Sequence, residues 1–388
     1  MIYLDNSATT KPSEAAVKAA NDAMTLTWGN PSATHSSGNE AARLLSLSRE
    51  AVCAAIGAKR GGKLIFTSCG TEADNIAVIG TAYAKERREK NGSRGVIMIS
   101  DGEHAAVENS AAKLESDGFT VIRVPTANGH LDIDFIKEHA SKDVILASFM
   151  LVNNETGAVY DVRQAAEAVR LASPDAVIHS DCVQALGKLR FSPSSLKVDA
   201  LTVSAHKIGG LKGTGALWIS DEIIKTKRTV PVIYGGGQEE NRRSGTENTV
   251  GIAAFAAACR EATADFDVRT EKLAELHRYA DGRLSSVDGI RINRAENPID
   301  AIISITLPKI KSETMLNFLS SKGICVSAGS ACSARSRHIS RALTSFGIPA
   351  EEADSTIRIS MSHENTPADI DALADALGEA LNRLQRIR

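Results

Sequence analysis

Short apolar runs recur between residues 63 and 220, and none of them alternates between apolar and polar positions. Turn-forming residues bound each run, which is typical of strands that are buried on both faces of a sheet. The runs cover residues 63–68, 95–100, 120–125, 143–150, 176–181, 200–205 and 215–220. We therefore expect a central sheet of seven buried strands.

Segments with helical spacing of apolar residues lie between most of these runs, for example at residues 72–90, 105–116 and 162–172. Strands that alternate with helices form a mainly parallel sheet with helices on both faces. The pattern predicts a large α/β domain that extends over about residues 14–257.

The pattern changes after about residue 257. A long helix candidate comes first, then strand candidates at residues 301–307 and 324–327, and finally an amphipathic helix at 367–388. These elements predict a smaller α+β domain of residues 258–388, joined by an N-terminal arm of residues 1–13. A chain with this organisation can form a closed cleft between its two domains.

Length and composition are those of a folded protein of two domains, with 388 residues, 43% of them hydrophobic and 24% charged. The net charge of -2 provides no broad basic surface, so we expect no direct nucleic-acid partner. No apolar run approaches the roughly 20 residues that span a bilayer, and the first seven residues do not resemble a signal peptide. We expect a cytoplasmic protein without membrane segments.

The six cysteines have no CxxC spacing, which argues against a disulfide framework or a dedicated zinc site. Cys325, on the predicted apolar strand 324–327, fits the usual buried thiol. Cys332 instead lies in a small, polar segment beside Arg335 and Arg337. Exposure and nearby positive charge lower the pKa of a thiol, so Cys332 is a candidate nucleophile.

Lys207 stands at the end of the predicted strand 200–205, and a glycine-rich stretch follows it at residues 208–215. A lysine at a strand end, next to backbone that glycines open to a ligand, is well placed for Schiff-base chemistry. The alternative is an ordinary surface lysine after a strand.

Asp181 ends another predicted strand and could keep a pyridine nitrogen protonated, although such an aspartate is commonly only a helix cap. Residues 66–75 pass from a strand through Gly70 to a helix, so free N–H groups and the Thr71 hydroxyl form a phosphate cradle or, alternatively, a simple cap. His104 follows the strand 95–100 at the same edge, where an imidazole could stack on a flat cofactor and move protons.

Arg358 lies in an alternating run at residues 355–360. Its planar guanidinium could bind a substrate carboxylate through two hydrogen bonds, or it could form an ordinary salt bridge. The glycine fingerprint of a dinucleotide-binding oxidoreductase is missing from the sequence, as is the lysine of a GxxxxGK[ST] loop.

Taken in order, these motifs resemble the cysteine desulfurases, a family of the fold-type I, class V aminotransferase-like enzymes that depend on pyridoxal phosphate. The resemblance covers nearly the whole chain. It is carried by residues 2–10, 29–35, 67–75, 103–104, 152–157, 179–181, 206–207, 243–246 and 329–332.

The resemblance implies roles for individual residues. Lys207 would hold pyridoxal 5'-phosphate covalently, and His104 would stack on its ring and assist proton transfer. Other cofactor contacts would come from Gly70, Thr71, Asn154, Asp181, Gln184, Ser204 and His206, with Thr246 supplied by the other subunit of a homodimer. The substrate would be bound by Asn154, Arg358, Asn6 and His35.

The family's activity would remove sulfur from L-cysteine, leaving L-alanine and a persulfide on Cys332. An acceptor protein would take that sulfur for iron–sulfur cluster assembly or tRNA thiolation. No resident metal is expected, although Cys332 could transiently bind an iron–sulfur cluster. A selenocysteine lyase or another class V aminotransferase-like enzyme remains an alternative, and a non-catalytic member is disfavoured because Lys207, Asp181 and Cys332 are all present.

Three stretches depart from the usual family pattern. The stretch from Cys332 to Leu343 is a few residues shorter, which would reduce the reach of the cysteine loop. Residues 208–213 and 360–365 also differ from the common forms. None of these changes removes a chemical group assigned above.

Overall fold

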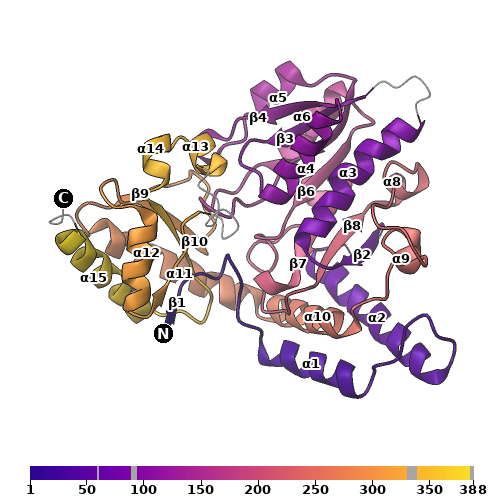
Figure 1. Cartoon of the computed structure of the whole chain (residues 1–388), viewed down its shortest axis with the longest axis horizontal. Helices are drawn as coiled ribbons and strands as arrows, with labels where there is room; N and C mark the ends of the chain where they lie inside the picture. The colour runs from indigo at the N-terminus through magenta and orange to yellow at the C-terminus, as the bar shows by residue number, and fades with distance from the viewer. Residues whose placement is uncertain (59–60, 89–93, 330–338, 385–388) are drawn as a thin grey trace.

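The seven predicted strands form one sheet in the computed structural model, which describes residues 1–58, 61–88, 94–329 and 339–384 (Figure 1). The order across the sheet is β2-β8-β7-β6-β5-β3-β4. Only β8 runs opposite to the other six strands, so the prediction of a mainly parallel sheet is confirmed. The strands are β2 (Lys63–Thr67), β3 (Val96–Ser100), β4 (Thr120–Val124), β5 (Val144–Ser148), β6 (Val177–Asp181), β7 (Ala200–Ser204) and β8 (Gly215–Ile219).

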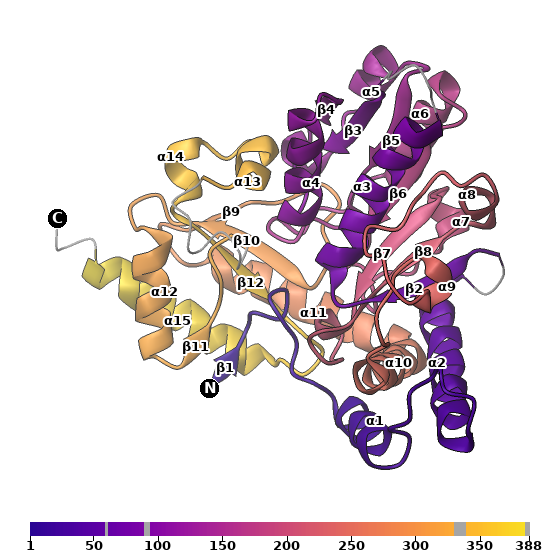
Figure 2. The ribbon, with the colours of Figure 1, turned by 45° about the vertical axis from the view of Figure 1, so that its right-hand side comes forward.

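Helices cover both faces of this sheet because its strands are apolar on both sides (Figure 2). Leu64 and Phe66 of β2 pack in the core cluster of one face, and Ile65 between them packs in the cluster of the other. The first face is covered by α2 (Ser36–Ala55), α6 (Val162–Ala172) and α10 (Thr249–Ala264), and the second by α3 (Gly70–Arg88) and α4 (Ala105–Ser116). The remaining helices of this part are α1 (Glu14–Thr25), which packs on α10, and the short α5 (Ile133–His139), α7 (Pro193–Leu196), α8 (Asp221–Lys225) and α9 (Gln238–Asn241).

A second, smaller part of the fold contains two further sheets. In the first, β10 (Ile302–Thr306) lies between β9 (Arg291–Ile292) and β12 (Thr356–Ser360), antiparallel to both. In the second, β1 (Ile2–Tyr3) of the N-terminal arm pairs with β11 (Ile324–Cys325) in parallel. The helices of this part are α11 (Phe266–Ser285), α12 (Ser312–Ser321), α13 (Arg341–Phe346), α14 (Ala350–Ala353) and α15 (Pro367–Leu384).

Two of the helices bear on the predicted limits of the domains and elements. Helix α10 runs through residue 257, where the sequence pattern places the end of the large domain, so that limit stays a prediction. Helix α15 begins at Pro367 as expected, and the last four residues of the predicted helix lie outside the described part of the chain.

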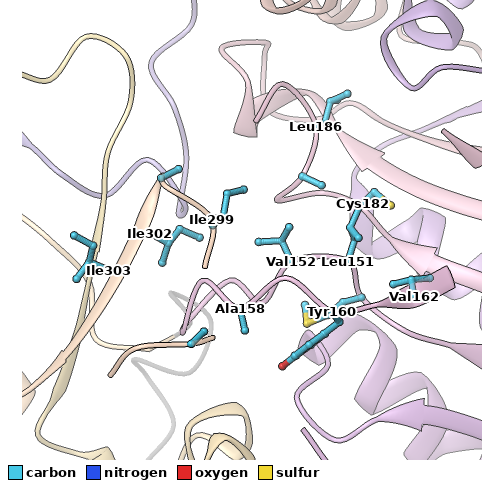
Figure 3. Close-up of a cluster of buried hydrophobic side chains, with 14 of the residues drawn as sticks. Leu151, Val152, Ala158, Tyr160, Val162, Cys182, Leu186, Ile299, Ile302 and Ile303 are labelled. Carbon is cyan, nitrogen blue, oxygen red and sulfur yellow. The ribbon is translucent and has the colours of Figure 1, made fainter. Parts of the chain in front are cut away.

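One hydrophobic core joins the two parts (Figure 3). Leu151 and Val152, which follow β5, belong to the same cluster of buried side chains as Ile302 and Ile303 of β10. Apolar burial of this kind holds the small part against the carboxyl edge of the large sheet. The strands β2, β3, β5, β6 and β7 all end at that edge, which is where open α/β sheets bind ligands.

Candidate active site

A cavity of about 190 Å³ lies at this edge, between the strand ends and the N-terminal arm. It brings together most of the residues that the sequence predicted for the site. Those that line it are Gly70, Thr71, His104, Asn154, Asp181, Gln184, Ser204, His206, Lys207 and Arg358. Residues that lie up to about three hundred positions apart in the sequence thus line one cavity.

Lys207 lies in a short 3₁₀ turn, Ala205–Lys207, directly after β7. Its Nζ donates hydrogen bonds to the carbonyl oxygens of Ser7 at 2.5 Å and Ala8 at 2.9 Å. Gln184 Nε2 donates to the same Ser7 carbonyl at 3.0 Å. The N-terminal arm therefore crosses over the lysine and fixes its amine inside the cavity.

Asp181 ends β6, and its Oδ1 accepts a hydrogen bond of 2.8 Å from the Val183 N–H, so the predicted capping contact is present. Burial raises the pKa of Asp181, while the charges of His104 and Lys207 and the Val183 N–H oppose that rise. The carboxylate is therefore a buried acceptor that faces two nitrogen-bearing side chains.

His104 caps α4, since its Nδ1 accepts a hydrogen bond of 3.1 Å from the Ala106 N–H. Burial lowers the pKa of His104, which favours the neutral ring at pH 7. A neutral imidazole with Nδ1 as acceptor carries its proton on Nε2. His104 can thus accept or return a proton only if its Nδ1 contact with the Ala106 N–H or the proton on Nε2 changes.

The predicted phosphate cradle is formed by the amino end of α3, where Gly70 and Thr71 line the cavity. Gly215 of β8 allows this turn to approach the sheet, because a Cβ at Gly215 would lie 2.5 Å from the carbonyl carbon of Cys69. Ser204 adds a buried hydroxyl that has no hydrogen-bond partner in the described structure. Free helix N–H groups beside an unpartnered hydroxyl suit an anionic oxygen.

Arg358 is 2% exposed and points into the opposite side of the cavity from β12. Its Nη1 donates to the Asn154 carbonyl at 2.8 Å, and its Nη2 donates to Asp5 Oδ1 at 2.9 Å. The sequence left open whether Arg358 forms an ordinary salt bridge. The structure contains one, with Asp5 as the partner. Nε has no hydrogen-bond partner among the described residues, and each terminal nitrogen has a second N–H, so donors remain for a ligand.

Four predicted residues do not line this cavity. Thr246 and His35 are exposed, and His35 caps α2 through its Nδ1. Asn6 is buried, and its Nδ2 donates to the Ser360 carbonyl at 3.1 Å. Cys332 lies outside the described residues.

The structure adds residues that the sequence patterns did not single out. Asp5 holds Arg358, and Arg243 pairs with Glu72 at 2.7 Å, which ties the segment before Thr246 to the start of α3. Asp74 lies in the cavity wall, one helical turn after Thr71. The helical spacing from Thr71 was the signal that could have identified Asp74.

Asp74, His104 and Asp181 bring their side-chain nitrogen and oxygen atoms within 4.8 Å of one another. Lys207, whose charge acts on both His104 and Asp181, disfavours a metal cation at this point. Unpartnered atoms of Ser204, Gln184 and Arg358 instead surround an amine, a carboxylate and a phosphate cradle. This set fits a flat ligand that carries a phosphate, an aldehyde and a ring nitrogen.

The aminotransferase class-V family model matches residues 2–373 of the chain. The chain belongs to the aminotransferase class-V family. Within it, the chain is similar to "Cysteine desulfurase IscS" of Dictyoglomus turgidum, with 35% identity over 100% of this chain and 96% of that protein. The predicted resemblance to the cysteine desulfurases of the class-V family is therefore confirmed.

Solved structures show the same likeness. A "NIFS-LIKE PROTEIN" has a TM-score of 0.89 and 30% identity, over 98% of this chain and 99% of that one. The structure described as "SspA in complex with cysteine" has a TM-score of 0.80 and 27% identity, over 94% of this chain and 100% of that one. The predicted fold-type I architecture of this chain is therefore confirmed.

Two further findings describe the chain as a whole. Cys53, Cys69, Cys182, Cys259 and Cys325, the cysteines of the described residues, are free thiols. Among the helices described, none is both long and apolar enough to cross a membrane.

Proposed function

We infer that the chain is a cysteine desulfurase that takes sulfur from L-cysteine, yields L-alanine and retains the sulfur as a persulfide on Cys332. The observation that carries this proposal is the cavity in which Lys207, Asp181 and Arg358 meet. An amine, a carboxylate and a carboxylate-binding cation are the groups needed by an enzyme that acts on amino acids with a pyridoxal cofactor. The cysteine desulfurases among the relatives support the choice of reaction.

Pyridoxal 5'-phosphate is the cofactor that fits this cavity. Lys207 would hold its aldehyde, Asp181 would hold its ring nitrogen, and Gln184 would contact its ring. Gly70, Thr71, Ser204 and His206 would surround its phosphate, completed by Thr246 of a second subunit. When bound, the cofactor supplies an electron sink for reactions at the substrate Cα.

Arg358 is the proposed anchor for the substrate carboxylate. Its two terminal nitrogens are already held by Asp5 and the Asn154 carbonyl, so the guanidinium is fixed before substrate arrives. A fixed cation loses little conformational entropy on binding. The free Nε and the Asn154 side chain would face the carboxylate of L-cysteine, which is also the ligand named for the related SspA structure.

His104 is the proposed proton carrier. Its buried ring is neutral near pH 7, so it can take a proton from the substrate and return one to the product. Burial also lowers the pKa of His206 to about 4, so this second imidazole is neutral as well. A neutral His206 would act toward a phosphate as a hydrogen-bond donor.

Cys332 is the proposed sulfur acceptor. Its thiolate attacks the sulfur of L-cysteine, and an S–S bond forms as the C–S bond breaks. The electron pair of the C–S bond stays on the carbon, which takes a proton and becomes the methyl group of L-alanine. The electrons balance without an external oxidant or reductant.

We further propose a homodimer in the cytoplasm that passes its persulfide to an acceptor protein. Thr246 is exposed in this subunit and is thus available to the cavity of another. A persulfide that is handed on requires reduced thiols, which a reducing compartment maintains. Iron–sulfur cluster assembly and tRNA thiolation remain the candidate destinations.

The test combines an absorption spectrum with product assays. We expect purified protein to show the absorption band of a lysine-bound pyridoxal cofactor, and Lys207→Ala to lose it. With L-cysteine and a reductant, the wild type should release sulfide and alanine in equal amounts. Cys332→Ala should keep the band but lose sulfide release, and Cys325→Ala serves as the matched thiol control.

Two outcomes would contradict the proposal. A colourless wild type that also fails to take up added pyridoxal phosphate would exclude the cofactor. Sulfide release that is indifferent to Cys332 would exclude the persulfide. A much higher specificity constant for L-selenocysteine than for L-cysteine would support the alternative of a selenocysteine lyase.

A further inference from the structure

Asp74 is a buried acid in the cavity wall to which the proposed mechanism gives no role. It lies on α3, is 1% exposed, and lines the cavity beside Asp181. Carboxylate oxygens of the two aspartates lie within 4.8 Å of each other and of a His104 ring nitrogen. Asp74 Oδ1 has no hydrogen-bond partner among the described residues.

Among the described residues, no cation compensates a charge on Asp74. His179 Nε2 is 3.6 Å from Asp74 Oδ1, but burial lowers the pKa of His179 to about 3, so this ring is neutral. Both nitrogens of His179 are already engaged, by Ser148 at 2.8 Å and by Thr202 at 3.0 Å. The Thr202 hydroxyl favours a charge on Asp74, but burial and the nearby Asp181, Glu103 and Cys69 outweigh it, and the net effect raises the pKa of Asp74.

Asp181 has the better environment for a charge. It accepts the Val183 N–H and faces Lys207, and both of these favour its ionised form. Two buried carboxylates at this separation cannot both ionise without a large cost. The proton of the pair therefore belongs on Asp74.

We propose that Asp74 is a positioning residue, a neutral acid that leaves Asp181 as the single negative charge beneath the cofactor ring. This inference rests on the proposed place of the cofactor. Burial, followed by the charge of Asp181, raises the pKa of Asp74 well above its usual range, which agrees with the geometry. Because Asp74 is neutral, only the charge of Asp181 acts on the pyridine nitrogen. This limits how strongly the pyridine nitrogen is protonated.

Infrared spectroscopy of the apoprotein tests the protonation directly and needs neither cofactor nor activity. At pH 7 we expect a carbonyl band of a protonated carboxyl group that shifts in protein labelled with carbon-13 aspartate and is lost in Asp74→Asn. Glu103→Gln is the control, because burial also raises the pKa of Glu103 to about 8 and its band should not respond to aspartate labelling. The labelling experiment uses wild-type protein, so the test stands even if a variant fails to fold.

A pH titration of the loaded enzyme tests the consequence. As the pH rises through the raised pKa of Asp74, the wild-type cofactor absorption should change, and Asp74→Asn should lack that alkaline transition. The proposal is overturned if no aspartate band is present at pH 7, or if the band is lost in Asp181→Asn rather than in Asp74→Asn. It is also overturned if the pH titrations of the wild type and of Asp74→Asn coincide. A colourless protein that keeps the infrared band would count against the proposed function and leave the protonation of Asp74 established.

Discussion

Ser180 and Ser204 are both fully buried serines of the central sheet, but only one of them has its hydroxyl satisfied. Ser180 Oγ donates to the Phe149 carbonyl at 2.8 Å, whereas Ser204 Oγ has no partner in the described structure. A buried polar group without a partner costs free energy, and such groups in a cavity wall mark where a ligand supplies the missing bond. At the scale of single residues, unmet hydrogen bonds thus identify the cofactor site.

This contrast predicts opposite behaviour for two matched substitutions. Ser204→Ala should weaken pyridoxal phosphate binding by about tenfold, the equivalent of about 1.4 kcal/mol, and leave the stability of the apoprotein unchanged or raised. Ser180→Ala should lower apoprotein stability by about 1 kcal/mol. Equilibrium denaturation and cofactor titration measure the two effects, and equal destabilisation of both apoproteins would refute the assignment.

Helix α13 shows how single elements position the site. It begins just after residues 330–338, and its first residue, Arg341, pairs with Asp101 at 2.7 Å and with Glu108 at 3.0 Å. Ser340, which caps the helix, donates to Glu155 at 2.7 Å. These partners belong to the large part of the fold. The chain that leaves the Cys332 segment is therefore anchored beside the cavity.

We expect Arg341→Gln to slow persulfide formation on Cys332 and leave the cofactor spectrum unchanged. The pair is half-exposed, so stability should fall by less than about 1 kcal/mol. Arg294→Gln is the control, since Arg294 is similarly exposed but pairs with Asp281, away from this anchor. Single-turnover measurements with L-cysteine would separate the two variants, and equal rates would show that the anchor has no part in the transfer.

Two groups of neighbouring apolar side chains are exposed on the surface of the molecule. Met24 lies in the last turn of α1, and Leu26 and Trp28 follow it between α1 and α2, with Trp28 71% exposed. Val232, Ile233 and Tyr234 form a second exposed stretch in the segment that leads to Thr246. Exposed apolar surface of this kind marks an interface between proteins. It agrees with the proposed dimer, in which Thr246 would complete the neighbouring site.

Trp28→Arg should therefore raise the dissociation constant of the dimer by at least about tenfold, because a charge would be buried in the interface. Leu171→Arg is the matched control, since Leu171 is 83% exposed on α6 and belongs to neither stretch. Sedimentation velocity measures the association, and cofactor affinity should fall with it as Thr246 is withdrawn. A wild type that is monomeric at micromolar concentration would contradict this prediction.

Much of the fold follows from local sequence. All seven strands of the main sheet formed within two residues of their predicted limits, because strands buried on both faces must be apolar throughout and end at turns. The helices at residues 105–116 and 162–172 were also predicted correctly. The antiparallel direction of β8 was not specified by the pattern, since an apolar run is the same in either direction.

The sequence by itself determined the chemical groups of the site, because strand ends and glycine turns place Lys207, Asp181 and Thr71 at one edge of any parallel sheet. Only the tertiary structure decided which partners those groups have. Asp5 reaches Arg358, and Asp74 comes to lie beside Asp181, through contacts between segments far apart in the chain. Protonation follows these contacts, since the charge of a buried acid depends on every group that the fold brings near it.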